Sequence, residues 1–383
     1  MKKKAETRSA AKDEIRTLLD DLRDRDWWIR QETISKLICY PPEAYVPEIT
    51  EWLRNDQDAL ARNASMEMFR GMGSGALGPL LSLLGDPDAD VRIFSANVLG
   101  DLQEPASLEA LGSALRDPDG NVRTAAVEAI GKIGVEKAVD LLSEAASDPE
   151  PWVLMAAVEA MGKIGGEKAL EGLYSCLEDR ECSAMACSAL AMAGVQSSID
   201  RLIPLLDQEE TRGPALQAAV AIADREKGTL PPSFFSGKIE MLIEWFASPQ
   251  DEMRRTALIA LSWSGDMRGL QCLLRASEDD QLLEYALHGL LSLGKRAAPE
   301  IVKAMHLQKK NKRMLAKILA MTGEQERLLI FADDEDEEVR TEVALAIGPL
   351  RTPAAEKALL ALSRDPVDEV REAALLSMRT SER

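Results

Sequence analysis

The chain has 383 residues with a formal net charge of −19, and 46% of the residues are hydrophobic while only 4% are aromatic. This negative charge argues against generic binding to nucleic acid and against attraction to anionic membrane surfaces. No run approaches the roughly 18 uncharged apolar residues of a membrane-spanning helix, and no signal peptide is recognisable, so we expect a cytoplasmic protein without membrane insertion.

The amino-terminal region divides into a basic segment and an aromatic segment. Residues 1–12 carry several Lys and Arg side chains and little apolar surface to bury, which predicts a disordered leader. Helical periodicity begins near Asp13, and residues 26–55 are predicted to form two helices interrupted at Pro41 and Pro42. This region also concentrates the aromatic residues Trp27, Trp28, Tyr40, Tyr45 and Trp52. They either cap one end of the structure or form a binding surface.

The central region repeats one sequence pattern three times. Residues 86–116, 117–147 and 148–178 align without a gap at a period of 31 residues. Each copy is predicted to begin with an Asp-Pro turn that leads into a first helix, a turn and a second helix. Glycines recur at the expected end of the first helix and in the turn, namely Gly100, Gly131, Gly162, Gly134 and Gly165. Such a period indicates a solenoid, in which each helix pair buries its apolar face against its neighbours.

Paired Asp and Arg residues recur six positions apart along the chain. The pairs are Asp86/Arg92, Asp117/Arg123, Asp334/Arg340 and Asp365/Arg371. With these pairs the copies resemble HEAT-like repeats of the short type named for phycobilisome lyase subunits. The resemblance implies an all-α fold, a right-handed α-solenoid (superhelix) of about 11 stacked helix-turn-helix repeats, in which the pairs form a ladder between neighbouring repeats. Leu154 replaces the arginine in the third copy, so we expect the ladder to be interrupted there.

The repeat pattern weakens beyond the third copy and is interrupted once. Residues 224–237 contain paired prolines and paired phenylalanines, which predicts an insertion loop. This loop would separate an N-terminal repeat segment at 13–223 from a C-terminal repeat segment at 238–383. Phe234 and Phe235 in the loop either anchor a protein partner or fold back over a gap between repeats.

Acidic residues recur at one position of the second helix. Together with one neighbouring acid they form what we name the acidic row: Glu109, Asp140, Glu144 and Glu171. The resemblance implies that second helices line the concave surface, where packed helices lie about 8–10 Å apart. The row either receives a basic helix or tail of a protein partner, or is an ordinary solvated face that Lys137 and Lys168 partly neutralise.

The sign of the charge reverses in the last third of the chain. Residues 295–317 are rich in Lys and Arg with Glu300 as their one acid, and acids occupy every position from 333 to 338. We name as the basic patch Lys303, Lys309, Lys310, Lys312, Arg313 and Lys317. The patch either docks an acidic partner or is neutralised by the adjacent acids, which would also favour the start of the following helix.

No catalytic, metal or cofactor motif is recognisable, which leads us to predict no metal and no cofactor. Cys176, Cys182 and Cys187 lack the spacing of structural zinc ligands, and His288 and His306 are too few for a di-iron HEAT-repeat enzyme. We therefore expect a non-catalytic scaffold or adaptor that presents a helical-repeat surface to a protein partner. Two alternatives stay open: a bilin lyase or isomerase subunit, implied by the repeat type alone, and a HEAT-like DNA glycosylase, against which the acidic row argues.

Overall fold

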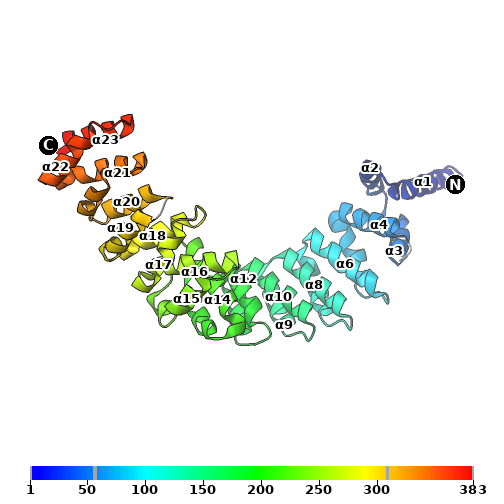
Figure 1. Cartoon of the computed structure of the whole chain (residues 1–383). Coiled ribbons are helices and arrows are strands. Elements are labelled where there is room, and N and C mark those ends of the chain that lie inside the picture. Colours follow the sequence, from blue (N-terminus) through cyan, green and yellow to red (C-terminus); the bar gives the residue numbers. More distant parts are fainter. Residues whose placement is uncertain (1, 55–57, 308–309, 382–383) are drawn as a thin grey trace. The chain divides into compact units, whose positions relative to one another are not determined.

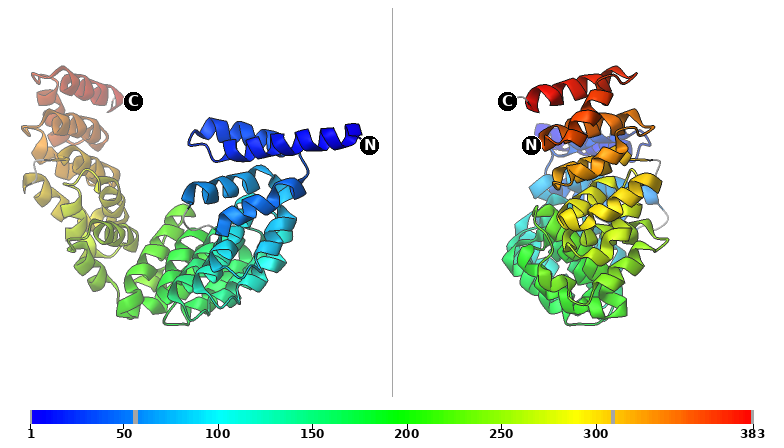
Figure 2. Two further views of the ribbon diagram at one scale, coloured as in Figure 1. Left: turned by 90° about the vertical axis from the view of Figure 1, so that its right-hand side faces the viewer. Right: turned by 60° about the vertical axis from the view of Figure 1, so that its left-hand side comes forward.

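In the residues that the structure describes, 2–54, 58–307 and 310–381 of this computed structural model, every regular element is an α-helix or a short 3₁₀-helix. The all-α prediction is therefore confirmed. Contacts between residues divide the chain into two compact units, Met1–Arg201 and Leu202–Arg383. The boundary between the two units, after Arg201, lies before the junction predicted at 224–237. Within each unit, successive helices follow one another as stacked pairs (Figures 1 and 2).

Unit 1 begins with one long helix, α1 (Lys2–Leu22), and continues with helix pairs. The first helices of the pairs are α2 (Trp27–Leu37), α4 (Ala59–Gly71), α6 (Ala89–Leu102), α8 (Gly120–Ile133), α10 (Pro151–Ile164) and α12 (Ser183–Ala193). The second helices are α3 (Val46–Arg54), α5 (Leu77–Leu83), α7 (Leu108–Ala114), α9 (Val139–Ala145), α11 (Gly166–Leu177) and α13 (Ile199–Leu202). The interruption predicted at Pro41 and Pro42 therefore separates α2 from α3.

Residues 2–12, for which we predicted a disordered leader, form the first turns of α1 in the structure. This segment contains no glycine and no proline, and Lys, Ala, Glu and Arg are strong helix formers. The second half of α1 packs against α2 and buries Ile15, Leu18, Leu19 and Leu22. A helix anchored in this way propagates outward with little further cost, because nucleation is the unfavourable step.

Unit 2 continues the same pattern with larger irregularities. Its first helices are α14 (Glu209–Arg225), α16 (Asp251–Ser264), α18 (Leu283–Leu293), α20 (Lys312–Met321), α21 (Glu337–Ile347) and α23 (Asp368–Ser381). Its second helices are α15 (Ile239–Phe246), α17 (Leu270–Ala276), α19 (Ala298–Leu307) and α22 (Pro353–Leu362), and the 3₁₀-helix Gln325–Phe331 takes this place after α20. The predicted insertion loop connects α14 to α15 and contains a 3₁₀ turn at Pro232–Phe235.

The Asp-Pro-Asp sequence at the start of the copies works differently from the prediction. In α6 and α8 the helix begins after the second aspartate, so the proline lies before the helix and not in its first turn. Asp88 and Asp119 are the N-caps, and each accepts a hydrogen bond from the backbone N–H two residues later, at 2.9 and 2.7 Å. In the third copy Pro149 likewise lies before the helix, and an additional proline, Pro151, occupies the first turn of α10.

The recurring glycines hold successive first helices close together. Gly100 lies within α6, and a Cβ built on it would sit 2.7 Å from Cα and 3.0 Å from Cβ of Ala129 in α8. A Cβ on Gly131 would likewise sit 2.8 Å from Cβ of Ala160 in α10. These glycines therefore serve close packing between repeats more than helix termination. Gly134, with φ of 66°, is the left-handed residue that ends α8 as predicted.

We expect Gly100→Ala to lower the free energy of unfolding by about 1–3 kcal/mol, the range of over-packing, although Ala is the better helix former. The added Cβ would contact the backbone of Ala129, so α6 or α8 must move. Chemical denaturation measures the change. Gly75→Ala is the control, because Gly75 has open space around its Cβ position and no left-handed φ. Equal stability of the two variants would contradict this account of the glycine.

Candidate functional site

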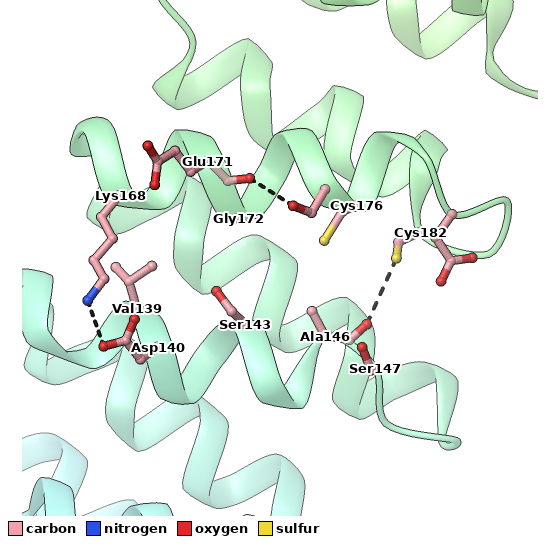
Figure 3. Close-up of a pocket in the computed structure, with 12 residues that line it drawn as sticks. Val139, Asp140, Ser143, Ala146, Ser147, Lys168, Glu171, Gly172, Cys176 and Cys182 are labelled. Carbon is pink, nitrogen blue, oxygen red and sulfur yellow. Dashed lines mark hydrogen bonds and ion pairs between the residues drawn. The ribbon is translucent and has the colours of Figure 1, made fainter.

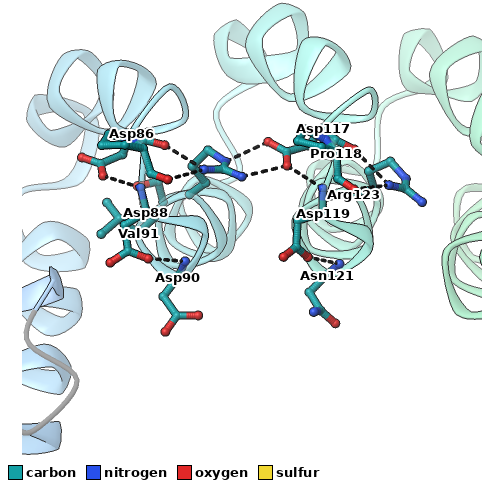
Figure 4. Close-up of polar contacts among 12 residues, drawn as sticks. Asp86, Asp88, Asp90, Val91, Asp117, Pro118, Asp119, Asn121 and Arg123 are labelled. Carbon is teal, nitrogen blue, oxygen red and sulfur yellow. Dashed lines mark hydrogen bonds and ion pairs between the residues drawn. The ribbon is translucent and has the colours of Figure 1, made fainter.

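The structure contains the predicted ladder, and its geometry is the same at Arg92, Arg123 and Arg340. Arg92 donates from Nε and Nη2 to the two carboxylate oxygens of Asp117, at 2.8 and 2.9 Å, and from Nη1 to the backbone oxygen of Asp86 (Figure 4). Arg123 makes the same contacts with Asp148, at 2.7 and 3.0 Å, and with the backbone oxygen of Asp117. We name each link from one repeat to the acid of the next a rung.

Rungs also occur in unit 2 and at positions outside the four predicted pairs. Arg340 donates to both carboxylate oxygens of Asp365, at 2.8 and 3.0 Å. Arg371 bonds only to the backbone oxygen of Asp365 and pairs with Asp368 of its own helix. Arg30 makes the same bidentate contact with Glu67. Related single-group contacts link Arg54, at the end of α3, to Asp86 and Lys312 to Asp334. The predicted interruption is present, because Leu154 is buried where the third copy would supply its arginine.

The rungs keep their acids ionised. Hydrogen bonds from Arg340 hold the pKa of Asp365 below its usual value and outweigh burial, which acts in the opposite direction. For Asp117 and Asp148, burial is the largest single influence and acts to raise the pKa. The combined effect of the arginine and a backbone N–H nevertheless lowers it. These contacts are structural, and they fix the register of the surfaces described next.

The acidic row lies on successive second helices of unit 1, and all of its members are exposed. Lys168 pairs with Asp140 at 2.6 Å, and Arg116 pairs with Glu144 at 2.8 Å. Within the described residues, Glu109 and Glu171 take part in no ion pair. Half of the row is therefore neutralised by the protein itself, and its two outer members are available to a partner.

A pocket of about 310 Å³ opens in the acidic row between α9 and α11 (Figure 3). Asp140, Lys168 and Glu171 lie toward one end and Cys176 and Cys182 toward the other (Figure 3), and Asp179 also belongs to the lining. Small residues complete much of the lining, namely Ser143, Ser147, Gly172 and Ser175. The pocket thus combines three carboxylates with small side chains that leave room for a long cationic side chain.

The thiols at this pocket are poor nucleophiles. Burial raises the pKa of Cys182 to about 12, and Cys176 shifts in the same direction for the same reason. Both thiols are thus protonated at neutral pH. Among the described residues no group of His, Cys, Asp and Glu is arranged to hold a metal ion.

Most of the basic patch is paired within unit 2. Lys312 is buried and lies 3.3 Å from Asp334, so its assignment to a partner surface is corrected to a rung. Arg313 lies 3.7 Å from Glu342, Lys303 pairs with Glu300, and Lys310 lies 3.9 Å from Asp280. Lys317 is exposed, and Lys309 lies outside the described residues. The pairing favours the neutralisation alternative over the docking alternative.

The two phenylalanines of the insertion loop have different environments. Phe234 is fully buried, and its ring meets that of Phe235 edge-on with centroids 5.6 Å apart. Phe235 is half-buried. Phe234 is therefore removed from the candidate partner contacts, because its side chain is inside the fold.

The aromatic segment at the start of unit 1 only partly behaves as a cap. Tyr45 is buried, whereas Trp27 and Trp28 are 50% and 74% exposed. The two tryptophan rings meet edge-on with centroids 4.8 Å apart. These two residues leave apolar surface open instead of sealing it.

Comparison with known proteins places the chain among helical-repeat proteins. A HEAT-repeat family model matches residues 46–117, 77–150, 109–182 and 298–379, which together make up more than half of the chain. No curated protein matches it significantly. Within the described residues, every helix is too short or too polar to cross a lipid bilayer.

Solved structures resemble it at low sequence identity. An engineered protein is 19% identical over 96% of this chain and 99% of its own, with a TM-score of 0.45. The CpcE–CpcF complex of phycocyanin lyase from Nostoc is 22% identical over 60% of this chain and 91% of its own, with a TM-score of 0.35. Kap95p, solved with RanGDP, is 14% identical over 98% of this chain and 62% of its own, with a TM-score of 0.54, which shows a shared fold.

Proposed function

Because the chain belongs to the HEAT-repeat family, we propose that it is a non-catalytic scaffold that binds a basic segment of a protein partner along the acidic row of unit 1. One observation carries the proposal: the pocket between α9 and α11 opens within the row itself. Stacked repeats present the same position at regular spacing, which suits an extended partner segment.

The charges of the row support a basic partner. Glu109 and Glu171 are exposed and lie on helices that flank α9. A Lys or Arg side chain of the partner could pair with Glu171 and compete with Lys168 for Asp140. Exposed pairs of this kind contribute little each, so affinity would come from several contacts and would fall as salt is added.

The non-catalytic part of the proposal rests on the chemistry of the pocket. Its thiols have raised pKa values, and the described residues beside them include no histidine that could act as their base. Its hydroxyls come from serines that lie among carboxylates. This arrangement suits the binding of a cation.

We expect the double variant Glu109→Lys/Glu171→Lys to lose the partner that the intact chain captures from its own cells, with affinity reduced roughly tenfold or more. Capture at two salt concentrations, followed by identification of the retained proteins and direct measurement of their affinity, tests this. The matched control is Asp90→Lys/Glu128→Lys, which changes the net charge equally on exposed positions of the first helices. Equal loss of the partner with both double variants, or no loss with either, would contradict the proposed surface.

Binding of an acidic partner by the basic patch stays a prediction. Lys303, Lys310 and Lys317 are exposed, but the first two are already paired within the protein. Charge reversal at Lys317 and Lys310 would disturb such a partner without breaking the rung at Lys312.

A further inference from the structure

One rung of the ladder in unit 2 is open. Arg254 of α16 occupies the rung position, and Asp279 follows it by 25 residues, the same separation as between Arg123 and Asp148. Asp279 nevertheless lies 4.0 Å from Nη2 of Arg254 and is 42% exposed. In the closed rungs the receiving aspartates Asp148 and Asp365 are 10% and 8% exposed.

The guanidinium of Arg254 is not fully paired. Its Nη2 donates to Asp251 of its own helix at 2.9 Å. Its Nε is buried and has no hydrogen-bond partner in the described part of the chain. In every closed arginine rung of the copies, Nε and Nη2 together grip one carboxylate. A buried donor without a partner costs free energy, so this position favours an acceptor from elsewhere.

A cavity of about 150 Å³ lies at the open rung. Arg254, Arg275 and Asp279 supply its charged groups, and Ser248 lies beside them. Phe246, Ala247, Ala276 and Leu282 complete its walls. The space is large enough for a carboxylate and one or two carbon atoms beyond it, and Arg275 supplies a second positive charge in its lining.

We propose that this cavity binds a carboxylate of a protein partner, an Asp or Glu side chain or a C-terminus, in the place that the ladder aspartate occupies in the closed rungs. The incoming carboxylate accepts from Nε and Nη2 of Arg254, and Arg275 balances its charge. Asp251 and Asp279 also face this arginine and lower the affinity for anions. The guanidinium group donates two parallel hydrogen bonds, so the cavity prefers a planar group with two oxygens, such as a carboxylate, over other anions.

The experiment observes the Nε–H group of Arg254 directly, by NMR of the full chain labelled with ¹⁵N at arginine. The probe is a peptide capped at both ends with one Asp, and the matched control peptide has Asn at that position. We expect the Arg254 signal, identified by its loss in Arg254→Lys, to shift with the Asp peptide and not with the Asn peptide. The Nε–H signal of Arg123, in a closed rung, should stay unchanged.

Three results would overturn the proposal. The first is an Arg254 signal that the Asp peptide does not move, and the second is a shift of equal size with both peptides. The third is a large displacement of that signal by Asp279→Asn, because it would mean that Asp279 already fills the fork. Inorganic phosphate is titrated in parallel, and a response to phosphate alone would reject the carboxylate assignment. This inference is independent of the acidic row, which lies in unit 1.

Discussion

Phe234→Ala should lower the free energy of unfolding by about 3–5 kcal/mol, the cost of removing a fully buried phenylalanine. The side chain is among the largest that are completely inaccessible to solvent, and it belongs to the loop that joins α14 to α15. Truncation removes apolar burial and leaves a cavity that a short 3₁₀ turn closes poorly. Chemical denaturation followed by circular dichroism measures the loss.

Phe235→Ala provides the matched comparison within the same loop. Its ring is half-buried and contacts Phe234 edge-on, so its removal should cost about 1 kcal/mol. If the loop contacts a partner through Phe235, this variant weakens capture while the fold persists. Similar stability losses in both variants would refute the distinction that we draw between the two rings.

Arg123→Gln should destabilise the protein by about 2 kcal/mol at neutral pH. The change leaves Asp148 ionised, 10% exposed and without its bidentate partner. Breaking a fully buried ion pair costs about 3–5 kcal/mol, and the residual exposure of this rung reduces the figure. Arg116→Gln is the control, because that arginine is 70% exposed and its pair with Glu144 should contribute nothing measurable.

The effect of Arg123→Gln should disappear in acid. The pKa of Asp148 is lower in the folded protein than in the unfolded chain, so the rung stabilises the fold above the ordinary aspartate pKa, about 3.9. As the pH falls through the lowered pKa, the carboxylate becomes protonated and this stability is lost. The unfolding curves of the two proteins should therefore converge below about pH 4. A difference that is constant across this range would exclude the ion pair as its cause.

The sequence repeats made the architecture predictable, whereas the directions of individual side chains could not be predicted. The 31-residue period located the helix pairs of the copies, and the six-residue spacing located Arg92, Arg123 and Arg340 in the ladder. The rung from Arg30 carries the same six-residue signature, because Asp24 precedes Arg30 by six residues and its backbone oxygen accepts from Nη1 of Arg30, but this pair lies outside the regular copies and was missed. No signal in the sequence identified its receiver, which is Glu67, 37 residues away, where the closed rungs of the copies use an aspartate 25 residues away.

Counting charges also misplaced Lys312 and could not rank the binding surfaces. The sequence shows that Lys312 stands in a basic run, but only the fold shows that it is buried against Asp334. Similarly, the spacing of Glu109, Asp140 and Glu171 predicted an aligned row. The pocket beside them depends on how α9 and α11 pack, and the sequence carries no direct signal for that.

The chemical equivalence of the copies has a consequence for how the gene can change. Gly100 meets Ala129 across the first interface and Gly131 meets Ala160 across the second, while Arg92 and Arg123 each grip an aspartate. If recombination removed residues 117–147, Arg92 would face Asp148 and Gly100 would face Ala160, so that no new kind of interface would arise. Unequal crossing-over could therefore shorten or lengthen this protein in steps of 31 residues, which would set how many carboxylates the row offers to a partner.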